Sequence, residues 1–435
     1  MNTLIIAIIG MVALIALVLA GVHIAVALGA VGFFGLVACL GFSQALSMVG
    51  IVGYQSIATF DYSVIPLFIL MGMLATAIGI SAESYDCLAK WLGKMPGGLG
   101  VATTLGCTAF GALNGSALVT ASVFAKVSAP EMIRYGYNKN LTYGMIAASG
   151  NIGQLIPPSI MIVIYGALSG DSIGRLLMAA ISPGLALAIG FSALTVAIAV
   201  VKPSVFPRVK QEYTWKEKFV SLKYLIPVAI VAIVIIGGIF SGMFSSSEAG
   251  AIGVLVFLVM ALIKKTPFKK ICEAFLDTME NAAMLFLILA CSAMFAKFMT
   301  VSGLAPKITT LVTASNLSPA MFLIGAVLVF VFLGCFIDAY SSIALTIPLF
   351  YPAAVALGID PIQFDMVCIL ALHMGGLTPP VGLCVYSVKA VTPPGTDVMG
   401  IFKGAMPYLG VMIIITLLFV FIPSLSTFIP DAMMG

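Results

Sequence analysis

Long apolar segments alternate with short polar ones along the chain, and this pattern predicts a bundle of membrane-crossing helices. Many of the apolar segments reach about 20 residues, the length of helix that crosses the hydrocarbon of a bilayer. They fall into two series, at about 4–21, 25–42, 61–80, 97–125, 140–168 and 176–201, then at about 225–243, 249–264, 282–301, 318–347, 364–391 and 405–429. We therefore predict an all-α polytopic membrane protein.

The two series match at an offset of about 222 residues, which indicates an internal duplication. Proline pairs stand at 157–158 and 379–380, and 379 − 157 = 222. The same offset relates Pro130 to Pro352, Gly136 to Gly358 and Gly153 to Gly375. A proline pair removes two backbone donors and disfavours helix before it. Each pair therefore predicts a helix broken in mid-span, in segments 140–168 and 364–391.

Two further segments contain a polar interruption and are predicted to be re-entrant hairpins. Segment 97–125 is interrupted at 111–116, and basic residues flank it on both sides, so that both its ends are expected on the cytoplasmic face. Its counterpart 318–347 is interrupted at 334–342 and is expected to enter from the other face. Non-helical backbone at membrane depth must be buried in protein or line a cavity. We expect the two tips and the two breaks to meet near the midplane.

Loop charge orients the two halves. The linker 202–223 carries six Lys or Arg residues against two acids, and four lysines lie between 264 and 270, so both regions are predicted to be cytoplasmic. The loop around Pro130 is basic, whereas its equivalent around Pro352 holds Asp360 and Asp365 with no Lys or Arg. Equivalent loops on opposite faces predict inverted-topology repeats. Both termini are then expected outside the cytoplasm.

Composition narrows the class of function. Only 8% of residues are charged and 62% are hydrophobic, whereas a soluble domain carries about 25% charged residues. The net charge of +4 comes from loop lysines, without a basic stripe that would indicate nucleic acid. The eight cysteines show no CxxC spacing, and neither a P-loop nor a nucleophile–base set is present. An enzyme or an ATP-driven pump is not expected.

The four interruptions carry the candidate chemistry. A broken helix frees carbonyls, which suit a small hard cation, and N–H groups at a positive helix end, which suit a carboxylate. Around the first break, Asn114, Gly115 and Ser116 can face Gly150, Asn151, Gly153 and Leu155. Around the second, Asp338, Ser341 and Ser342 can face Gly375, Leu377 and Thr378. The alternative is that these small residues only let helices pack closely.

Asp338 is the most informative single residue because it follows a long apolar run. An intramembrane carboxylate is a functional hypothesis by default, and the alternative is a residue that caps the helix after the break. A proton relay needs titratable groups along a path, which are scarce here, so sodium is favoured over protons. Of the two histidines, His23 is expected at a turn, and His373 either shapes the second site or packs in the core.

Several sequence blocks resemble a known family. The residues are Pro130–Tyr137, Ile156–Ser159 with Tyr165–Gly166, Ser182–Gly184, Ala356–Pro361 and Leu377–Leu383. Together they resemble the large membrane subunit of tripartite ATP-independent periplasmic (TRAP) transporters, over essentially the whole chain. One departure is Asn114-Gly115-Ser116, where many members carry Ser-Gly-Ser.

The resemblance implies sodium-coupled import of an organic acid, such as a C4-dicarboxylate or sialic acid, across the bacterial inner membrane. It implies two partners, a small four-helix membrane subunit and a periplasmic substrate-binding protein, besides the surrounding lipid. The first sodium site would use Asn114, Gly115, Ser116, Gly153 and Pro157. The second would use Asp338, Ser341, Gly375, Leu377 and Pro380. The substrate cavity between them would be lined by Ser116, Asn151, Ser159, Ser342 and Thr378.

The resemblance also implies an elevator, in which a transport domain moves against a scaffold. Scaffold parts are expected at 1–80 and 224–301, transport-domain parts at 81–201 and 302–435, and the linker at 202–223. The stretches 45–58 and 266–280 are expected to be interfacial helices or docking surfaces for a partner. A stand-alone ion-coupled carboxylate carrier, a channel and an intramembrane enzyme stay as alternatives.

Overall fold

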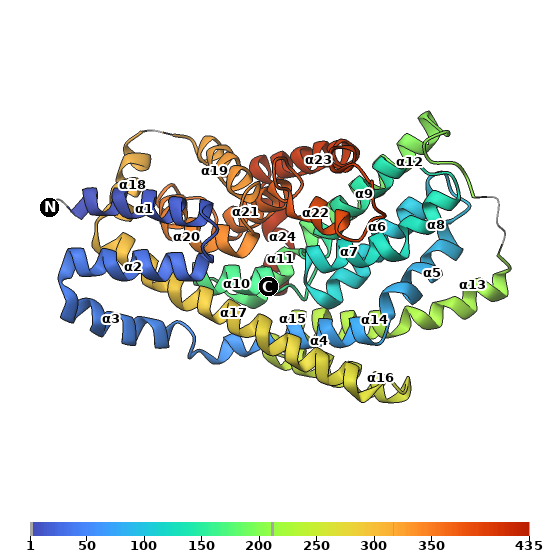
Figure 1. Cartoon of the computed structure of the whole chain (residues 1–435), viewed down its shortest axis with the longest axis horizontal. Coiled ribbons are helices and arrows are strands. Elements are labelled where there is room, and N and C mark those ends of the chain that lie inside the picture. Colours follow the sequence, from blue (N-terminus) through green and yellow to red (C-terminus); the bar gives the residue numbers. More distant parts are fainter. Residues whose placement is uncertain (1–2, 210–212, 316, 435) are drawn as a thin grey trace.

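A computed structural model describes residues 3–209, 213–315 and 317–434. Throughout these ranges the regular elements are helices, as Figure 1 shows. Six of the described helical stretches are long and apolar enough to cross a membrane, and a bent pair at 215–240 adds a seventh if it is one span. The predicted all-α polytopic membrane fold is confirmed.

The first half of the chain contains a set of spans, a helical hairpin and a broken helix. Its helices are α1 (Thr3–Leu19), α2 (Ile24–Leu40), α3 (Phe42–Gln55), η1 (Phe60–Ser63), α4 (Val64–Ala77), α5 (Ile80–Leu92), α6 (Gly98–Asn114), α7 (Ala117–Val127), α8 (Ala129–Arg134), α9 (Lys139–Ile152), α10 (Ile160–Ser169), α11 (Ile173–Ala179) and α12 (Ile181–Val201).

The second half repeats this order. Its helices are α13 (Trp215–Ser221), η2 (Leu222–Tyr224), α14 (Ile226–Ala232), η3 (Ile233–Gly237), α15 (Gly238–Phe240), α16 (Ser246–Ile263), α17 (Phe268–Val301), α18 (Leu304–Ala314), α19 (Pro319–Gly334), α20 (Ala339–Ala356), α21 (Pro361–Gly375), α22 (Leu383–Lys389), α23 (Val398–Phe421) and α24 (Ser424–Met434).

Both predicted helix breaks are present. The backbone leaves helix between α9 and α10, at 153–159, and between α21 and α22, at 376–382. The hairpin α6–α7 turns at 115–116, and its repeat equivalent α19–α20 turns at 335–338. The amide between the two prolines is cis in each pair. Equivalent elements of the two halves therefore share the same interruptions.

Three features differ from the sequence expectation. The stretch 266–280 is continuous with the following span in the 34-residue helix α17, which runs along α2. The residues around Pro352 form no loop, because Pro348 and Pro352 both lie inside α20. Asp365 is likewise no loop residue: it is fully buried within α21. Tertiary packing accommodates these prolines and this acid, and local sequence rules do not capture such packing.

The linker ends in a helix that packs on α5. The indole N–H of Trp91 donates to the carbonyl of Lys218 at 3.0 Å, and its ring lies 6.3 Å from that of Trp215. Glu217 closes a capping box with Thr214 at the start of α13, and hydrogen bonds from the Thr214 backbone and hydroxyl lower the pKa of this carboxyl. Trp215 is itself exposed, and its contact with Trp91 helps to hold α13 on α5.

Candidate functional site

The first hairpin tip is held by side-chain hydrogen bonds. Gly115 adopts φ +62°, a conformation that favours glycine, and so ends α6. The Asn114 side chain spans the tip: its amide donates to the Thr120 hydroxyl at 2.9 Å, and its oxygen accepts from the Ser116 N–H at 2.7 Å. Ser116 in turn caps α7 through the Val119 N–H. Asn114 thus supplies the acceptor that the turn removes from the Ser116 N–H and ties the tip to α7.

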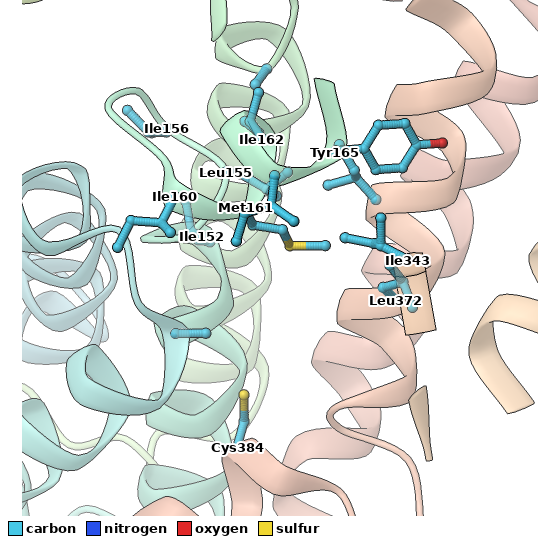
Figure 2. Packing of buried hydrophobic residues seen from close by; sticks show 14 of the residues in the cluster. Ile152, Leu155, Ile156, Ile160, Met161, Ile162, Tyr165, Ile343, Leu372 and Cys384 are labelled. Atoms are coloured by element: carbon cyan, nitrogen blue, oxygen red, sulfur yellow. The ribbon is translucent and has the colours of Figure 1, made fainter. Parts of the chain in front are cut away.

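The first break lies against that hairpin and is completely buried. Every residue from 151 to 160, Pro157 and Pro158 included, is buried. A methyl group on Gly111 would lie 1.9 Å from the Cα of Gly153, so the two backbones touch. Ser159 donates to the carbonyl of Gln154 and caps α10 through the Ile162 N–H. Figure 2 shows the apolar residues packed around this break.

The second hairpin tip is organised by Asp338. One carboxylate oxygen accepts from the Ser341 N–H at 3.0 Å, and the other accepts from the Ser341 hydroxyl. Asp338 is thus the N-cap of α20. The carboxylate is half-buried and also borders a cavity, so capping and a role in binding are compatible at this position.

The second break repeats the glycine contact of the first. A methyl group on Gly375 would lie 2.6 Å from the Cα of Gly334. The offsets are 334 − 111 = 223 and 375 − 153 = 222, so the two contacts are repeat-equivalent. The environments differ, however. Leu377 is buried and the Thr378 hydroxyl donates to Met374, but Pro379 and Pro380 are exposed, unlike the buried first pair.

The two halves of the site meet at the centre of the molecule. The Asn151 amide of α9 donates to the carbonyl of His373 in α21 at 3.1 Å. The Gln154 amide donates to the hydroxyl of Tyr340, at the start of α20, at 3.1 Å. The Asn151 oxygen accepts from the Cys384 thiol at 2.9 Å. The first break is therefore bonded directly to elements of the second repeat.

A cavity of about 540 Å³, here called the tip cavity, lies where both tips and both breaks converge. The residues that line it are Ser116, Ala117, Leu118, Asn151, Gln154, Gly334, Ile337, Asp338, Ala339, Tyr340, Leu372, His373, Gly376, Leu383 and Cys384. Its lining combines an apolar wall with a small number of hydroxyl, amide and carboxylate groups, as small-molecule sites do.

A larger cavity of about 1040 Å³, the lateral cavity, lies between the tips and parts of α2, α4 and α17. It shares Ser116, Leu118, Asp338 and Tyr340 with the tip cavity. Its opposite wall includes His23, Thr76 and Asn281, and the backbone of α4 approaches the first tip so closely that a methyl on Gly72 would lie 2.5 Å from the Asn114 Cα. The two cavities are therefore adjacent and share part of one wall.

Helix ends and charge give this region a distinctive electrostatic character. Among the residues that line the two cavities there is one carboxylate, Asp338, and neither Lys nor Arg. Three helices begin at these cavities, α7 after Ser116, α10 after Ser159 and α20 after Asp338. Their N-terminal ends carry positive partial charge and free N–H groups. The region offers neutral donors to an anion and oxygen ligands to a cation.

The structure brings some of the predicted site residues together and separates others. Ser116, Asn151 and Asp338 line the tip cavity, and Asn114 lines the lateral one. The others lie away from both cavity walls: Gly115, Gly153, Pro157, Ser159, Ser341, Ser342, Gly375, Leu377, Thr378 and Pro380. Several of these form the backbone behind the walls, whereas Thr378 borders an apolar groove between α19 and α23.

Sequence reasoning did not single out three polar groups of this region. Gln154, Tyr340 and Asn281 line the cavities, and the first two bond to each other across the repeats. Gln154 and Tyr340 stand within three residues of a break or a tip. A search of all polar residues next to the interruptions would have found them. Asn281 carries no such signal, because α17 is continuous there.

Comparison with known proteins gives a consistent result. The family model described as "Tripartite ATP-independent periplasmic transporter, DctM component" matches residues 11–425. The C4-dicarboxylate TRAP transporter large permease protein DctM of Pseudomonas aeruginosa is 30% identical over 84% of this chain and 85% of its own. The sialic acid TRAP transporter large permease protein SiaM of Vibrio cholerae is 29% identical over 87% and 88%.

A solved structure agrees at the level of the fold. The YdaH transporter of Alcanivorax borkumensis superposes with a TM-score of 0.63 over 87% of this chain and 88% of its own, at 13% identity. At this identity the likeness concerns architecture alone.

Proposed function

The chain belongs to the DctM-type large permeases of the TRAP transporters, and from this premise we propose that it imports an organic acid together with sodium ions. It is a multi-pass membrane transporter that carries out secondary-active solute import, and not an enzyme. The named relatives transport C4-dicarboxylates in one case and sialic acid in another. The proposed substrate class is therefore a carboxylate of this size range.

The observation that carries the proposal is the lining of the two cavities. An organic acid entering them meets Asp338 and no Lys or Arg. In a medium of low dielectric, its charge needs compensation by a partner of opposite sign. The N-termini of α7, α10 and α20 supply part of this compensation. Sodium ions bound by the oxygens of the tips and breaks supply the rest, so that the anion and the cations are bound together.

The two sodium sites are proposed at the two tip-and-break pairs. The first combines the tip at Asn114 and Ser116 with the carbonyls of the first break, and the second combines Asp338 with the backbone that ends α21. Both are rich in oxygen and poor in nitrogen and sulfur ligands, as hard cations require. The repeat-equivalent glycine contacts support the pairing, because each brings the backbone of a hairpin onto the backbone of a break.

The lateral cavity supports an elevator arrangement. It lies between the tips and the helices α2, α4 and α17, which would belong to the scaffold parts at 1–80 and 224–301. The parts at 81–201 and 302–435 would carry the tips and breaks across the membrane, with inverted repeats and both termini outside the cytoplasm. A membrane subunit and a periplasmic binding protein complete the proposed system, as the tripartite family implies.

Reconstitution tests the proposal. The chain is placed in proteoliposomes with its candidate small subunit, and uptake of a labelled C4-dicarboxylate or sialic acid is measured. Uptake is expected only with both a sodium gradient and the binding protein. Saturable uptake without the binding protein would instead identify a stand-alone carrier. Steady current without saturation would identify a channel, and uptake indifferent to sodium would refute the coupling.

A further inference from the structure

A second group of polar residues lies away from the two cavities, at the far end of α10. Asp171 follows the glycine that ends α10, and its carboxylate accepts from the Tyr351 hydroxyl of α20 at 2.6 Å. Asp365 of α21 faces Asp171 and the hydroxyl of Tyr165. The four residues therefore join the first repeat to the second at one point.

Asp365 is buried beside a second acid and, among the described residues, without a basic partner. Its side chain is 0% exposed, and neither carboxylate oxygen has a hydrogen-bond partner; the Tyr165 hydroxyl, also 0% exposed, has none either. Figure 2 shows Tyr165 directed from α10 toward the helices of the second repeat. An ionised carboxylate in such surroundings is costly, and a second carboxylate beside it increases the cost.

The elements around Asp365 supply no cation to neutralise it. On its own helix stand Asp360 at the N-cap and Cys368, and α10 and α20 contribute Tyr165 and Tyr351. Arg175 of α11 and Asp431 of α24 pair with each other at 3.4 Å. No charged side chain of α19 or of the adjoining end of α23 is present in the described sequence.

We propose that Asp365 and Asp171 form a proton-binding site, with Asp365 as the carboxyl that holds the proton. A hydronium ion from solvent gives its proton to the Asp365 carboxylate, which becomes a neutral acid, and water is released. Asp171 provides the route for the proton from solvent to Asp365, because it borders an open cavity of about 1280 Å³ together with Asp61 and Tyr62. Tyr351 and Tyr165 lie beside the two carboxyls and can relay the proton.

The site is placed to influence transport. α10 has 10 residues, beginning at the first break with the Ser159 cap and ending at Gly170, next to Asp171. Loss of the proton would set two negative charges against each other between α10 and α21. The contact between the repeats would then weaken at the C-terminal end of α10. The N-terminal end of the same helix borders the lateral cavity. The proton site is separate from the proposed sodium sites and does not depend on them.

Infrared spectroscopy of the purified full-length protein tests the proposal directly, because a buried protonated carboxyl has its own C=O band. We expect this band at neutral pH in the wild type and in Asp360→Asn, which keeps the helix cap. We expect its loss in Asp365→Asn, where a neutral amide replaces the neutral acid and the fold is retained. In Asp171→Asn the band is expected to disappear at a lower pH than in the wild type, because the neighbouring charge is gone.

Three outcomes would overturn the proposal. One is the absence of a protonated-carboxyl band in the wild type at neutral pH. Another is a band that persists unchanged in Asp365→Asn, or, where that variant does not fold, a band whose titration is unaltered in Asp171→Asn. The third is removal of the band by sodium chloride at constant pH, which would make this a sodium site. The first two outcomes do not bear on sodium-coupled uptake, which is measured separately.

Discussion

The side-chain amide of Asn151 donates to the backbone carbonyl of His373 at 3.1 Å, and the two residues occupy equivalent positions of the two repeats, since 373 − 151 = 222. A contact between equivalent positions lies where the pseudo-symmetry axis passes. The duplicated halves are therefore bonded to each other at α9 and α21, immediately before both breaks. This hydrogen bond and that from Gln154 to Tyr340 join the two candidate ion sites.

Replacing Asn151 by Leu should destabilise the protein by about 0.6 kcal/mol, the average measured for hydrogen bonds between membrane helices, and by no more than the measured maximum of about 1.7 kcal/mol. The His373 carbonyl would lose its donor in a buried place. Equilibrium unfolding in mixed micelles measures the change. Cys384→Ala removes only the thiol that donates to Asn151 and should cost less. Equal stability of Asn151→Leu and the wild type would show that the bond between the repeats contributes nothing.

Alanine at Gly153 or Gly375 should destabilise the protein by about 1–3 kcal/mol and abolish uptake, because the added methyl meets backbone that cannot move aside. It would lie 2.5 Å from the Gly111 Cα in one case and 2.6 Å from the Gly334 Cα in the other. Thermal unfolding and proteoliposome uptake report the two effects. The matched control is Gly325→Ala in α19, where a methyl meets nothing within 4 Å. A similar loss of stability and uptake in all three variants would show that the glycine contacts have no special role.

Asp338→Asn separates capping from ion binding. Asn is as good an N-cap as Asp, so α20 should keep its start, while the negative charge is lost. We expect the sodium concentration for half-maximal uptake to rise about tenfold or more, which corresponds to about 1.4 kcal/mol. Ser116→Ala should weaken sodium dependence in the same direction, and Trp215→Ala should not. If the dependence of uptake on sodium concentration is unchanged in Asp338→Asn, this residue acts only as a helix cap.

Acid should loosen the linker helix α13. Two hydrogen bonds from Thr214, at 2.7 and 2.8 Å, lower the pKa of Glu217. A depressed carboxyl pKa stabilises the folded form above the pKa of the unfolded chain, and this contribution is lost as the pH falls through the lower, folded value. Trp91 and Trp215, whose rings meet edge to face, report the change through their fluorescence. Glu217→Gln should abolish this acid transition, and Glu248→Gln, in an identical capping box on α16, should leave it intact.

The amino-acid sequence alone was sufficient to locate the interruptions of the helices. The proline pairs remove donors and enforce a break whatever surrounds them, so positions 157–158 and 379–380 mark the two breaks by their residue types. The polar insertions near Asn114 and Asp338 marked the two tips for a similar reason. These signals are local, and each is repeated at a constant offset.

Packing decided what the sequence could not show. Pro352 looked like a loop residue, yet it lies inside α20, and Asp365 looked like a surface acid, yet it is buried. The partners of Asn151 and Gln154 come from the other repeat, and pairing between distant residues has no periodic signature. The amphipathic helices α5 and α18 were missed because they are short and flank more obvious spans.

The unequal surroundings of the two proline pairs have a consequence for the transport cycle. Pro157 and Pro158 are buried, whereas Pro379 and Pro380 are exposed. In the inverted-repeat arrangement proposed above, exchanging the conformations of the halves turns a structure open to one side into one open to the other. On that proposal, the structure would represent one end state of alternating access. In the opposite end state the second pair would become enclosed and the first uncovered. A cysteine-directed label should therefore react near position 379 in the present state, and near position 157 in the opposite state.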